Sequence, residues 1–237
     1  MIKAGLFMCD HVADEYIEEF GDYSDMFLHL FPDFNWTLYD CVNGIFPKDL
    51  NECDVYFATG SKHSVFEDIP WILRLKKVVA ELYHNEKCFV GFCFGHQLIG
   101  ESLGGKVEKS PNGWCVGVHD FEVINTKKWM VPSQMDFAVL MMCQDQILEL
   151  PHHSEVLAQS EKCPYALIQV GERFLGIQGH PEFSKEYDQM LMETRMNRMG
   201  DEVAISGINS LSQDIDNDLI KTWVVSFIKG TIRNSNS

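Results

Sequence analysis

The sequence predicts an α/β fold of three layers, in which a mostly parallel central sheet lies between two layers of helices. Through the first hundred residues, apolar, strand-like runs alternate with helical patterns, which favours parallel strands joined by helices. Between residues 106 and 178 the pattern changes, and several short strands follow one another with turn residues between them. We therefore expect a parallel sheet with a small antiparallel extension.

The 237-residue chain is expected to form a single domain that spans residues 1–237. This length fits one large domain, and 46% of the residues are hydrophobic, which suffices for a large core. The sequence shows no internal repeat, linker or low-complexity tract that would mark a boundary between domains.

Four strands and two helices are expected in the first part of the chain. Each strand is a short apolar run. The first helix shows apolar residues at helical spacing with basic residues between them, and the second stops at Gly104-Gly105, where glycine can cap a helix. The expected strands are residues 4–8, 36–42, 54–59 and 87–92, and the helices are residues 71–86 and a short one that closes with residues 99–103.

Short strands and then helices are expected in the rest of the chain. Turn signals such as Pro111-Asn112-Gly113 separate the strands, which are residues 118–124, 137–142, 156–158, 166–170 and 174–177. Helices return after Ser184, and residues 219–228 have the pattern of an amphipathic helix. The tail from residue 234 to residue 237 is expected to fray.

Charge and hydropathy argue against two classes of partner. The formal net charge is −16, from 35 acidic and 19 basic residues. Such a surface repels a phosphate backbone, so no nucleic-acid partner is expected. The chain contains no apolar run of the roughly 18 residues that a membrane span needs, so no membrane partner is expected either.

The eight cysteines are spaced irregularly, and most lie in apolar runs where cysteine acts as a small buried hydrophobe. The first residues lack the long apolar core and cleavage site of a secretory signal. We therefore expect reduced cysteines and a cytoplasmic protein. There is no Cys-x-x-Cys, and His152-His153 has no partner at metal-ligand spacing, so neither a metal site nor a cofactor is expected.

One cysteine has a different setting. Cys93 stands between Gly91 and Gly95, directly after an expected strand and directly before an expected helix. This is the pattern of a nucleophile elbow, in which the chain folds back so sharply that the neighbours two positions away must be small. The N-terminus of the following helix would favour the reactive thiolate. The alternative interpretation is another buried cysteine between closely packed glycines.

A nucleophilic cysteine needs a base and a group that orients the base. His180 follows an apolar strand, at the edge where ligand sites form in parallel α/β folds, and Glu182 can reach the far nitrogen of its ring. Alone, this His-Pro-Glu segment would more often be an ordinary loop, and it is the joint occurrence with the Cys93 segment that favours catalysis. His96 is expected to point away from the sulfur. The histidines expected to lie on the surface are His63, His84, His119, His152 and His153.

Together the two segments, Gly-x-Cys-x-Gly-His-Gln at 91–97 and Gln-Gly-His-Pro-Glu-Phe at 178–183, resemble the class I glutamine amidotransferases. The resemblance covers roughly residues 50–185. It implies the flavodoxin-like architecture of that family and a reaction through a γ-glutamyl thioester. By this resemblance Cys93 is the nucleophile, His180 is the base and acid, and Glu182 orients His180.

The resemblance also implies an oxyanion hole and a substrate site. The oxyanion hole would use the backbone N–H of Phe94 and that of Gly60, in the turn after the third strand. Gln97 matches the glutamine that helps to hold the amino-acid end of the substrate. Gln144 and Asp145 fall where the family has a polar strand end near the substrate.

Three residues depart from the usual pattern of this family. Ser61 follows Gly60 where many members have proline, Cys143 replaces a usual histidine, and Phe94 replaces a common leucine or tyrosine. None of these removes a catalytic group. Two of them, Ser61 and Cys143, lie near the expected pocket.

The chain resembles the free-standing branch of the family that includes the γ-glutamyl peptidases. We therefore predict a cysteine-dependent hydrolase or transferase that acts on the γ-glutamyl amide bond of glutamine or γ-glutamyl peptides. One alternative is a glutaminase subunit that delivers ammonia to a separate synthase partner. A less favoured one is a non-catalytic binding relative, against which the intact Cys93, His180 and Glu182 argue.

Overall fold

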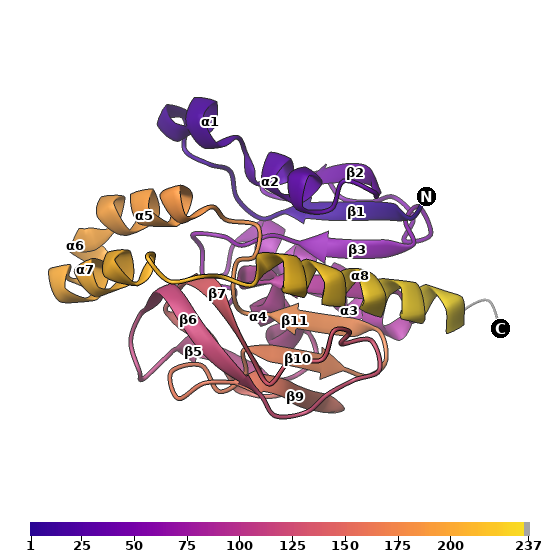
Figure 1. Ribbon diagram of the computed structural model, residues 1–237. Coiled ribbons are helices and arrows are strands. Elements are labelled where there is room, and N and C mark those ends of the chain that lie inside the picture. The colour runs from indigo at the N-terminus through magenta and orange to yellow at the C-terminus, as the bar shows by residue number, and fades with distance from the viewer. Residues whose placement is uncertain (235–237) are drawn as a thin grey trace.

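A central sheet of nine strands runs through the computed structural model, which describes residues 1–234 (Figure 1). Its parallel strands are β1 (Lys3–Met8), β2 (Asn35–Asp40), β3 (Val55–Ala58), β4 (Cys88–Phe92) and β11 (Phe174–Ile177). The same sheet continues through the antiparallel strands β6 (Cys115–Val123), β7 (Asp136–Cys143), β9 (Ser154–Gln159) and β10 (Leu167–Val170). The order across the sheet is β2-β1-β3-β4-β11-β10-β9-β6-β7. A small antiparallel sheet pairs β5 (Lys106–Lys109) with β8 (Asp145–Glu149).

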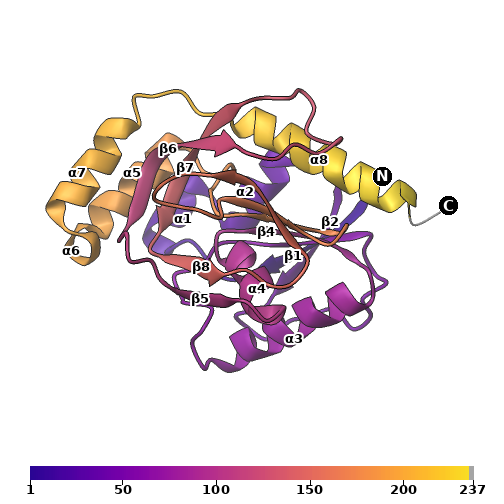
Figure 2. The same ribbon diagram turned by 90° about the horizontal axis from the view of Figure 1, so that it is seen from below.

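Helices cover both faces of the parallel strands. Those that pack on these strands are α2 (Tyr23–Leu30), α3 (Pro70–His84), α4 (Phe94–Ser102) and α8 (Asn217–Asn234). The other helices of the described residues are α1 (Asp14–Phe20), α5 (Lys185–Thr194), α6 (Met196–Met199) and α7 (Asp201–Ser210). Seen from below, α8 lies on one side of the sheet and α3 with α4 on the other (Figure 2). The predicted three-layer α/β fold is therefore confirmed.

The two faces of the sheet bury separate apolar cores, because successive side chains of a strand point in opposite directions. Phe57 of β3 is buried in one core with Phe27 of α2 and Trp223 of α8. Its neighbour Tyr56 is buried in the other core with Leu75 of α3. The run Val55–Ala58 is fully buried, as expected for a strand covered on both faces.

The expected elements agree with the observed ones to within a few residues, but four elements were missed. α1 buries none of its residues, so it shows no apolar stripe. α2 was missed although Asp22 and Asp25 form a capping box at its start. β5 buries a single residue, and β8 is a short strand that begins with the polar residues Asp145 and Gln146. Of the tail expected to fray, Asn234 ends α8 and residues 235–237 lie outside the described residues.

The antiparallel half of the sheet curves back toward its parallel half. β7 is the last strand in the sheet order, yet the carbonyl of Leu140 in β7 accepts a hydrogen bond of 2.8 Å from the backbone N–H of His180, just after β11. Ala138 of the same strand exchanges backbone and side-chain hydrogen bonds with Asp216. The edge of β7 is thus covered, and the segment after β11 is held against it.

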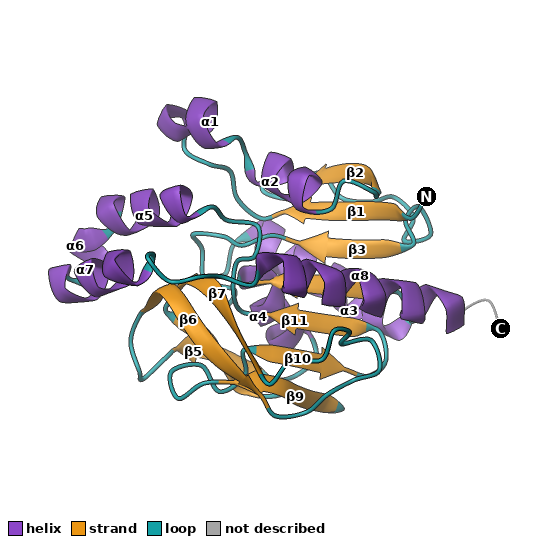
Figure 3. Cartoon of the chain, viewed as in Figure 1, coloured by secondary structure: helices purple, strands orange, loops and turns teal. Residues whose placement is uncertain are grey.

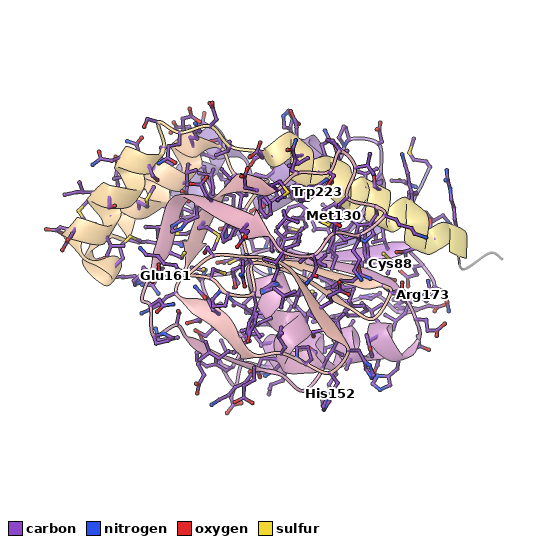
Figure 4. The ribbon with its side chains drawn as sticks, turned by 60° about the horizontal axis from the view of Figure 1, so that its bottom comes forward. Cys88, Met130, His152, Glu161, Arg173 and Trp223 are labelled. Carbon is purple, nitrogen blue, oxygen red and sulfur yellow. The ribbon has the colours of Figure 1, made fainter. Side chains whose placement is uncertain are left out.

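Helix α8 connects the two halves of the molecule. The indole Nε1 of Trp223 donates a hydrogen bond of 2.9 Å to the carbonyl of Pro132, in the connection between β6 and β7. Figure 4 shows Trp223 on α8 and Met130 in this connection, both of which are buried in the same apolar core. In the part of the chain that the structure describes, no helix combines the length and apolar character needed to cross a membrane.

Helix α4 packs so closely on the sheet that one of its residues can only be glycine. A Cβ atom on Gly95 would lie 2.5 Å from the backbone oxygen of Ala58 in β3. Backbone atoms cannot move aside as the end of a flexible side chain can. The contact brings the start of α4 against the end of β3, where two parallel strands and a helix meet.

We expect Gly95→Ala to lower the free energy of unfolding by about 1–3 kcal/mol, the usual cost of overpacking a close contact. Gly230→Ala in α8 is the matched control, because a Cβ there meets no atom within 4 Å. Alanine favours a helix over glycine by about 1 kcal/mol, so the control should be neutral or stabilising. Urea unfolding followed by circular dichroism measures both, and equal effects in the two variants would contradict the contact.

Candidate active site

The turn between β4 and α4 holds Cys93 in a strained backbone conformation. Its φ of 49° and ψ of −101° lie in a region that non-glycine residues rarely adopt. A Cβ on Gly91 would lie 2.2 Å from the carbonyl oxygen of Gly95, so the chain does fold back on itself here. The backbone N–H of Cys93 donates to the carbonyl of Ile177 in β11 at 2.8 Å, which fixes the turn to the neighbouring strand.

The segment after β11 brings His180 to the same place. The carboxylate Oε1 of Glu182 lies 2.8 Å from the ring Nδ1 of His180, and both side chains are buried. The ring stacks on Phe183, with the centroids 4.0 Å apart and the planes at 11°. This hydrogen bond and this stacking fix the orientation of the ring, and Nδ1 is occupied, so Nε2 is the nitrogen left for Cys93.

The electrostatics of His180 follow from its two neighbours. Burial disfavours the charged imidazolium, but Cys93 and Glu182 favour it through charge and hydrogen bonding, and together they raise the pKa of His180 to about 10. The structure therefore brings Cys93, His180 and Glu182 together as one hydrogen-bonded group. An imidazolium held next to a cysteine favours the thiolate, which is the nucleophilic form.

Gly60 and Phe94 are both neighbours of Cys93. A Cβ on Gly60 would be 2.9 Å from Cε1 of His180 and 3.8 Å from Cβ of Cys93, so only a glycine leaves room for the ring. Phe94 is the first residue of α4, and its backbone N–H has no partner within the helix. Two backbone groups are thus close to the position where a carbonyl attacked by Cys93 would lie.

Gln97, Gln144 and Asp145 line one pocket together with Cys93. The amide Nε2 of Gln97 donates to the backbone carbonyl of Asp145 at 2.7 Å and to the side chain of Gln178 at 3.2 Å. The side chain of Asp145 accepts a hydrogen bond from the hydroxyl of Ser64. Gln97 is therefore committed to holding the start of β8, whereas the Asp145 carboxylate faces the pocket.

The pocket is shallow, with a cavity volume of about 60 Å³, and opens to solvent. It is lined by Cys93, which follows β4, and the carboxyl ends of the parallel strands point to the side where α5, α6 and α7 extend (Figure 3). This is the edge at which ligand sites form in such sheets. Among residues 1–234 no group of three or more potential metal ligands is close enough to hold a metal ion.

Part of this pocket was not predicted from the sequence, and two histidines do not lie on the surface as expected. His63 was expected on the surface but lines the pocket, and His119 is half-buried between Cys115 and Val116 instead of exposed. The pocket residues that were missed are Lys62, Ser64, Lys109, Trp114, Met142, Arg195 and Arg198. Most of them come from loops or distant helices, and no local pattern places them beside Cys93.

A further buried carboxylate lies behind His180 and was also missed. Asp188 of α5 is fully buried, and its oxygens make no hydrogen bond of standard geometry to the described residues. Burial raises the pKa of Asp188 to about 7, although His180, Arg195 and the nearby Gly117 amide favour the charged form. Its signal in the sequence is weak, because one acidic residue in an amphipathic helix usually faces solvent.

Comparison with known proteins assigns this chain to a family. The family model described as glutamine amidotransferase class-I matches residues 72–198. Gamma-glutamyl peptidase 3 of Arabidopsis thaliana is 33% identical over 191 residues, which cover 75% of each chain. The chain belongs to the class-I glutamine amidotransferase family. The expectation of an enzyme of this class is thereby confirmed.

Two other relatives show the range of this family. A glutamine amidotransferase from Thermotoga maritima has the same fold, with a TM-score of 0.76 at 19% identity, over 98% of this chain and 99% of that one. The glutamine-hydrolysing GMP synthase of Limosilactobacillus reuteri is 30% identical over 168 residues. That match covers 70% of this chain but 29% of the synthase.

Asp188 gives this class-I glutamine amidotransferase a predicted pH dependence of stability. Its pKa of about 7 in the folded protein is above its ordinary value of 3.8, so the folded state keeps a proton that the unfolded chain releases. Stability is therefore lost as the pH rises through this window. The free energy of unfolding of Asp188→Asn, relative to that of the parent, should therefore rise as the pH goes from 4 to 7, by up to about 4 kcal/mol.

Urea unfolding of both proteins at pH 5 and pH 8 measures this difference. Glu186→Gln, an exposed position on the same helix, controls for the loss of one negative charge. A constant difference between Asp188→Asn and the parent at the two pH values would show that Asp188 does not titrate in this range.

Proposed function

We propose that this chain is a cysteine-dependent γ-glutamyl hydrolase that works through a thioester on Cys93. The observation that carries the proposal is the placement of Cys93 on a strained strand-to-helix turn, beside a buried His180 that Glu182 orients at 2.8 Å. A nucleophile, a base and an orienting carboxylate in this order form a catalytic triad.

In the proposed reaction the Cys93 thiolate attacks the γ-carbonyl carbon of the substrate. The negative charge that develops on the carbonyl oxygen is stabilised by the backbone N–H groups of Phe94 and Gly60. One such donor contributes about 10²–10³ in rate in other hydrolases. The C–N bond then breaks, and His180 transfers its proton to the leaving nitrogen. The product of this step is a γ-glutamyl thioester on Cys93 and a free amine.

Water completes the cycle. His180, now neutral, takes a proton from a water molecule that attacks the thioester carbon. The C–S bond breaks, glutamate leaves, and Cys93 returns to the thiolate as His180 becomes charged again. Because Glu182 accepts a hydrogen bond at Nδ1, the same ring nitrogen, Nε2, handles both protons without rotation of the ring.

The γ-glutamyl end of the substrate is proposed to bind on the side of Gln144 and Asp145. The Asp145 carboxylate faces the pocket and is suited to the α-ammonium group of a glutamyl residue. Gln97 acts indirectly, because its amide holds the backbone of Asp145 at 2.7 Å. Lys109, hydrogen-bonded to Gln144 at 3.1 Å, brings a positive charge to the same side for the α-carboxylate.

A glutaminase subunit that supplies ammonia to a synthase is the second candidate. It is favoured by the similarity to GMP synthase, which covers 70% of this chain. The peptidase relative matches over 75% of both chains and at higher identity, so we favour hydrolysis without a partner. The third candidate, a non-catalytic binding relative, gives no reason for Cys93, His180 and Glu182 to form one hydrogen-bonded group.

The purified protein tested on glutamine and on a panel of γ-glutamyl peptides, including glutathione, distinguishes these candidates. We expect release of glutamate from γ-glutamyl peptides, and no release by Cys93→Ala. A diazo-ketone analogue of glutamine should label Cys93 once per chain. If the whole panel stays intact until a synthase or cell extract is added, and ammonia then appears, the chain is an amidotransferase subunit.

The two residues that support Cys93 should differ in importance. His180→Asn removes the group that moves both protons, so kcat/KM should fall by at least about 10³. Glu182→Gln keeps a hydrogen-bonding group at Nδ1 and should retain at least about ten times more activity than His180→Asn. Steady-state kinetics on one γ-glutamyl peptide measure both, with circular dichroism to verify folding. Equal losses would assign Glu182 a role beyond orienting the ring.

A further inference from the structure

The pocket beside Cys93 is cationic in a chain that is strongly acidic. The net charge is −16, yet the cationic side chains of Lys62, Lys109, Arg195 and Arg198 line this one pocket with a single carboxylate, Asp145. The general field of the protein repels anions. A local excess of positive charge at the site therefore indicates that the substrate brings negative charge to it.

Two of these cations already have partners within the protein. The ammonium of Lys62 lies 2.9 Å from the carboxylate of Asp10, and that of Lys109 donates to the side chain of Gln144 at 3.1 Å. The guanidinium groups of Arg195 and Arg198 form no ion pair with any acidic side chain of residues 1–234. With Lys109 assigned to the γ-glutamyl end of the substrate, Arg195 and Arg198 are the cations of this pocket that are left for the leaving group.

Both arginines are held in place at the end of α5. Arg195 caps that helix, with its backbone N–H bonded to the carbonyl of Leu191 at 3.1 Å, and it is half-buried. Arg198 lies in α6, and its guanidinium is 6.0 Å from the ring centroid of Trp114, which also lines the pocket. Two planar guanidinium groups near the ring of Trp114 are suited to bind a carboxylate that is attached to an organic group.

Helix α5 connects the segment of His180 to the two arginines. His180 protonates the leaving nitrogen, so that nitrogen must be on the side of His180. Helix α5 begins a few residues after His180, and its buried Asp188 is close enough to both His180 and Arg195 to be affected by the charge of each. Gln144 and Asp145, the proposed site of the γ-glutamyl end, belong to the end of β7 and the start of β8.

From this arrangement we propose that Arg195 and Arg198 bind a carboxylate on the leaving group of the substrate. The preferred substrates are then γ-glutamyl amino acids or peptides with a free carboxylate, in preference to glutamine, whose leaving group is ammonia. This inference rests on the proposed hydrolysis at Cys93. It adds the class of amine that the enzyme removes.

A matched pair of substrates tests the inference. γ-Glutamylglycine and γ-glutamylglycinamide differ only in the carboxylate on the leaving group. We expect the parent protein to hydrolyse γ-glutamylglycine with a kcat/KM at least about ten times higher, as for one hydrogen-bonded ion pair of ordinary strength. In the double variant Arg195→Gln, Arg198→Gln this preference should disappear, because kcat/KM for γ-glutamylglycine falls to that for the amide.

Lys77→Gln is the control variant, because it removes one positive charge from the exposed surface of α3 and should leave the preference intact. Equal rates on the two substrates in the parent, or a preference that survives in the double variant, would overturn the inference but not the proposed hydrolysis. A double variant that loses both substrates equally would assign the arginines to the γ-glutamyl end and also overturn it. If neither substrate shows turnover that depends on Cys93, the proposed hydrolysis fails as well.

Discussion

The active-site geometry depends on the absence of side chains at Gly91 and Gly95. A Cβ on Gly91 would meet the backbone of Gly95 at 2.2 Å, and a Cβ on Gly95 would meet the backbone of Ala58 at 2.5 Å. The chain can therefore reverse direction over a few residues and start α4 directly against the sheet. The strained φ of 49° at Cys93 is a consequence of this reversal. Only the packing on both sides of the turn stabilises such a conformation.

The active-site geometry also requires that β7, which is distant in the sheet order, lies next to the segment that carries His180. β7 belongs to the antiparallel half of the sheet, yet its Leu140 carbonyl accepts the backbone N–H of His180. The curvature of that half thus determines where the ring of His180 lies. Gly60 then provides the space for the ring, since a Cβ would lie 2.9 Å from Cε1. Three strands, β3, β4 and β11, and the edge of β7 therefore position one histidine and one cysteine.

The sequence was sufficient for the fold class and for the elements around Cys93, because both are encoded locally. Alternation of apolar runs and helical stripes specifies parallel strands, and glycines at 91 and 95 specify the tight turn. The walls of the pocket could not be predicted in this way. Arg195 follows Cys93 by about a hundred residues and reaches the pocket only because α5 extends past the strand ends. His63 was expected to be exposed because it lies in a polar loop, and nothing in that loop indicates that it lines a pocket.

The charge state of His180 connects the two halves of the proposed reaction. Burial lowers its pKa, whereas Cys93 and Glu182 raise it, and the balance keeps the ring protonated before the attack. When the Cys93 thiolate attacks the carbonyl carbon, its negative charge passes to the carbonyl oxygen, so one of the two groups that favour the imidazolium no longer carries charge. Burial, which disfavours the imidazolium, is then opposed by Glu182 alone, and the pKa of His180 must fall. The ring can therefore give its proton to the leaving amine and act as a base toward water, with no movement of the protein.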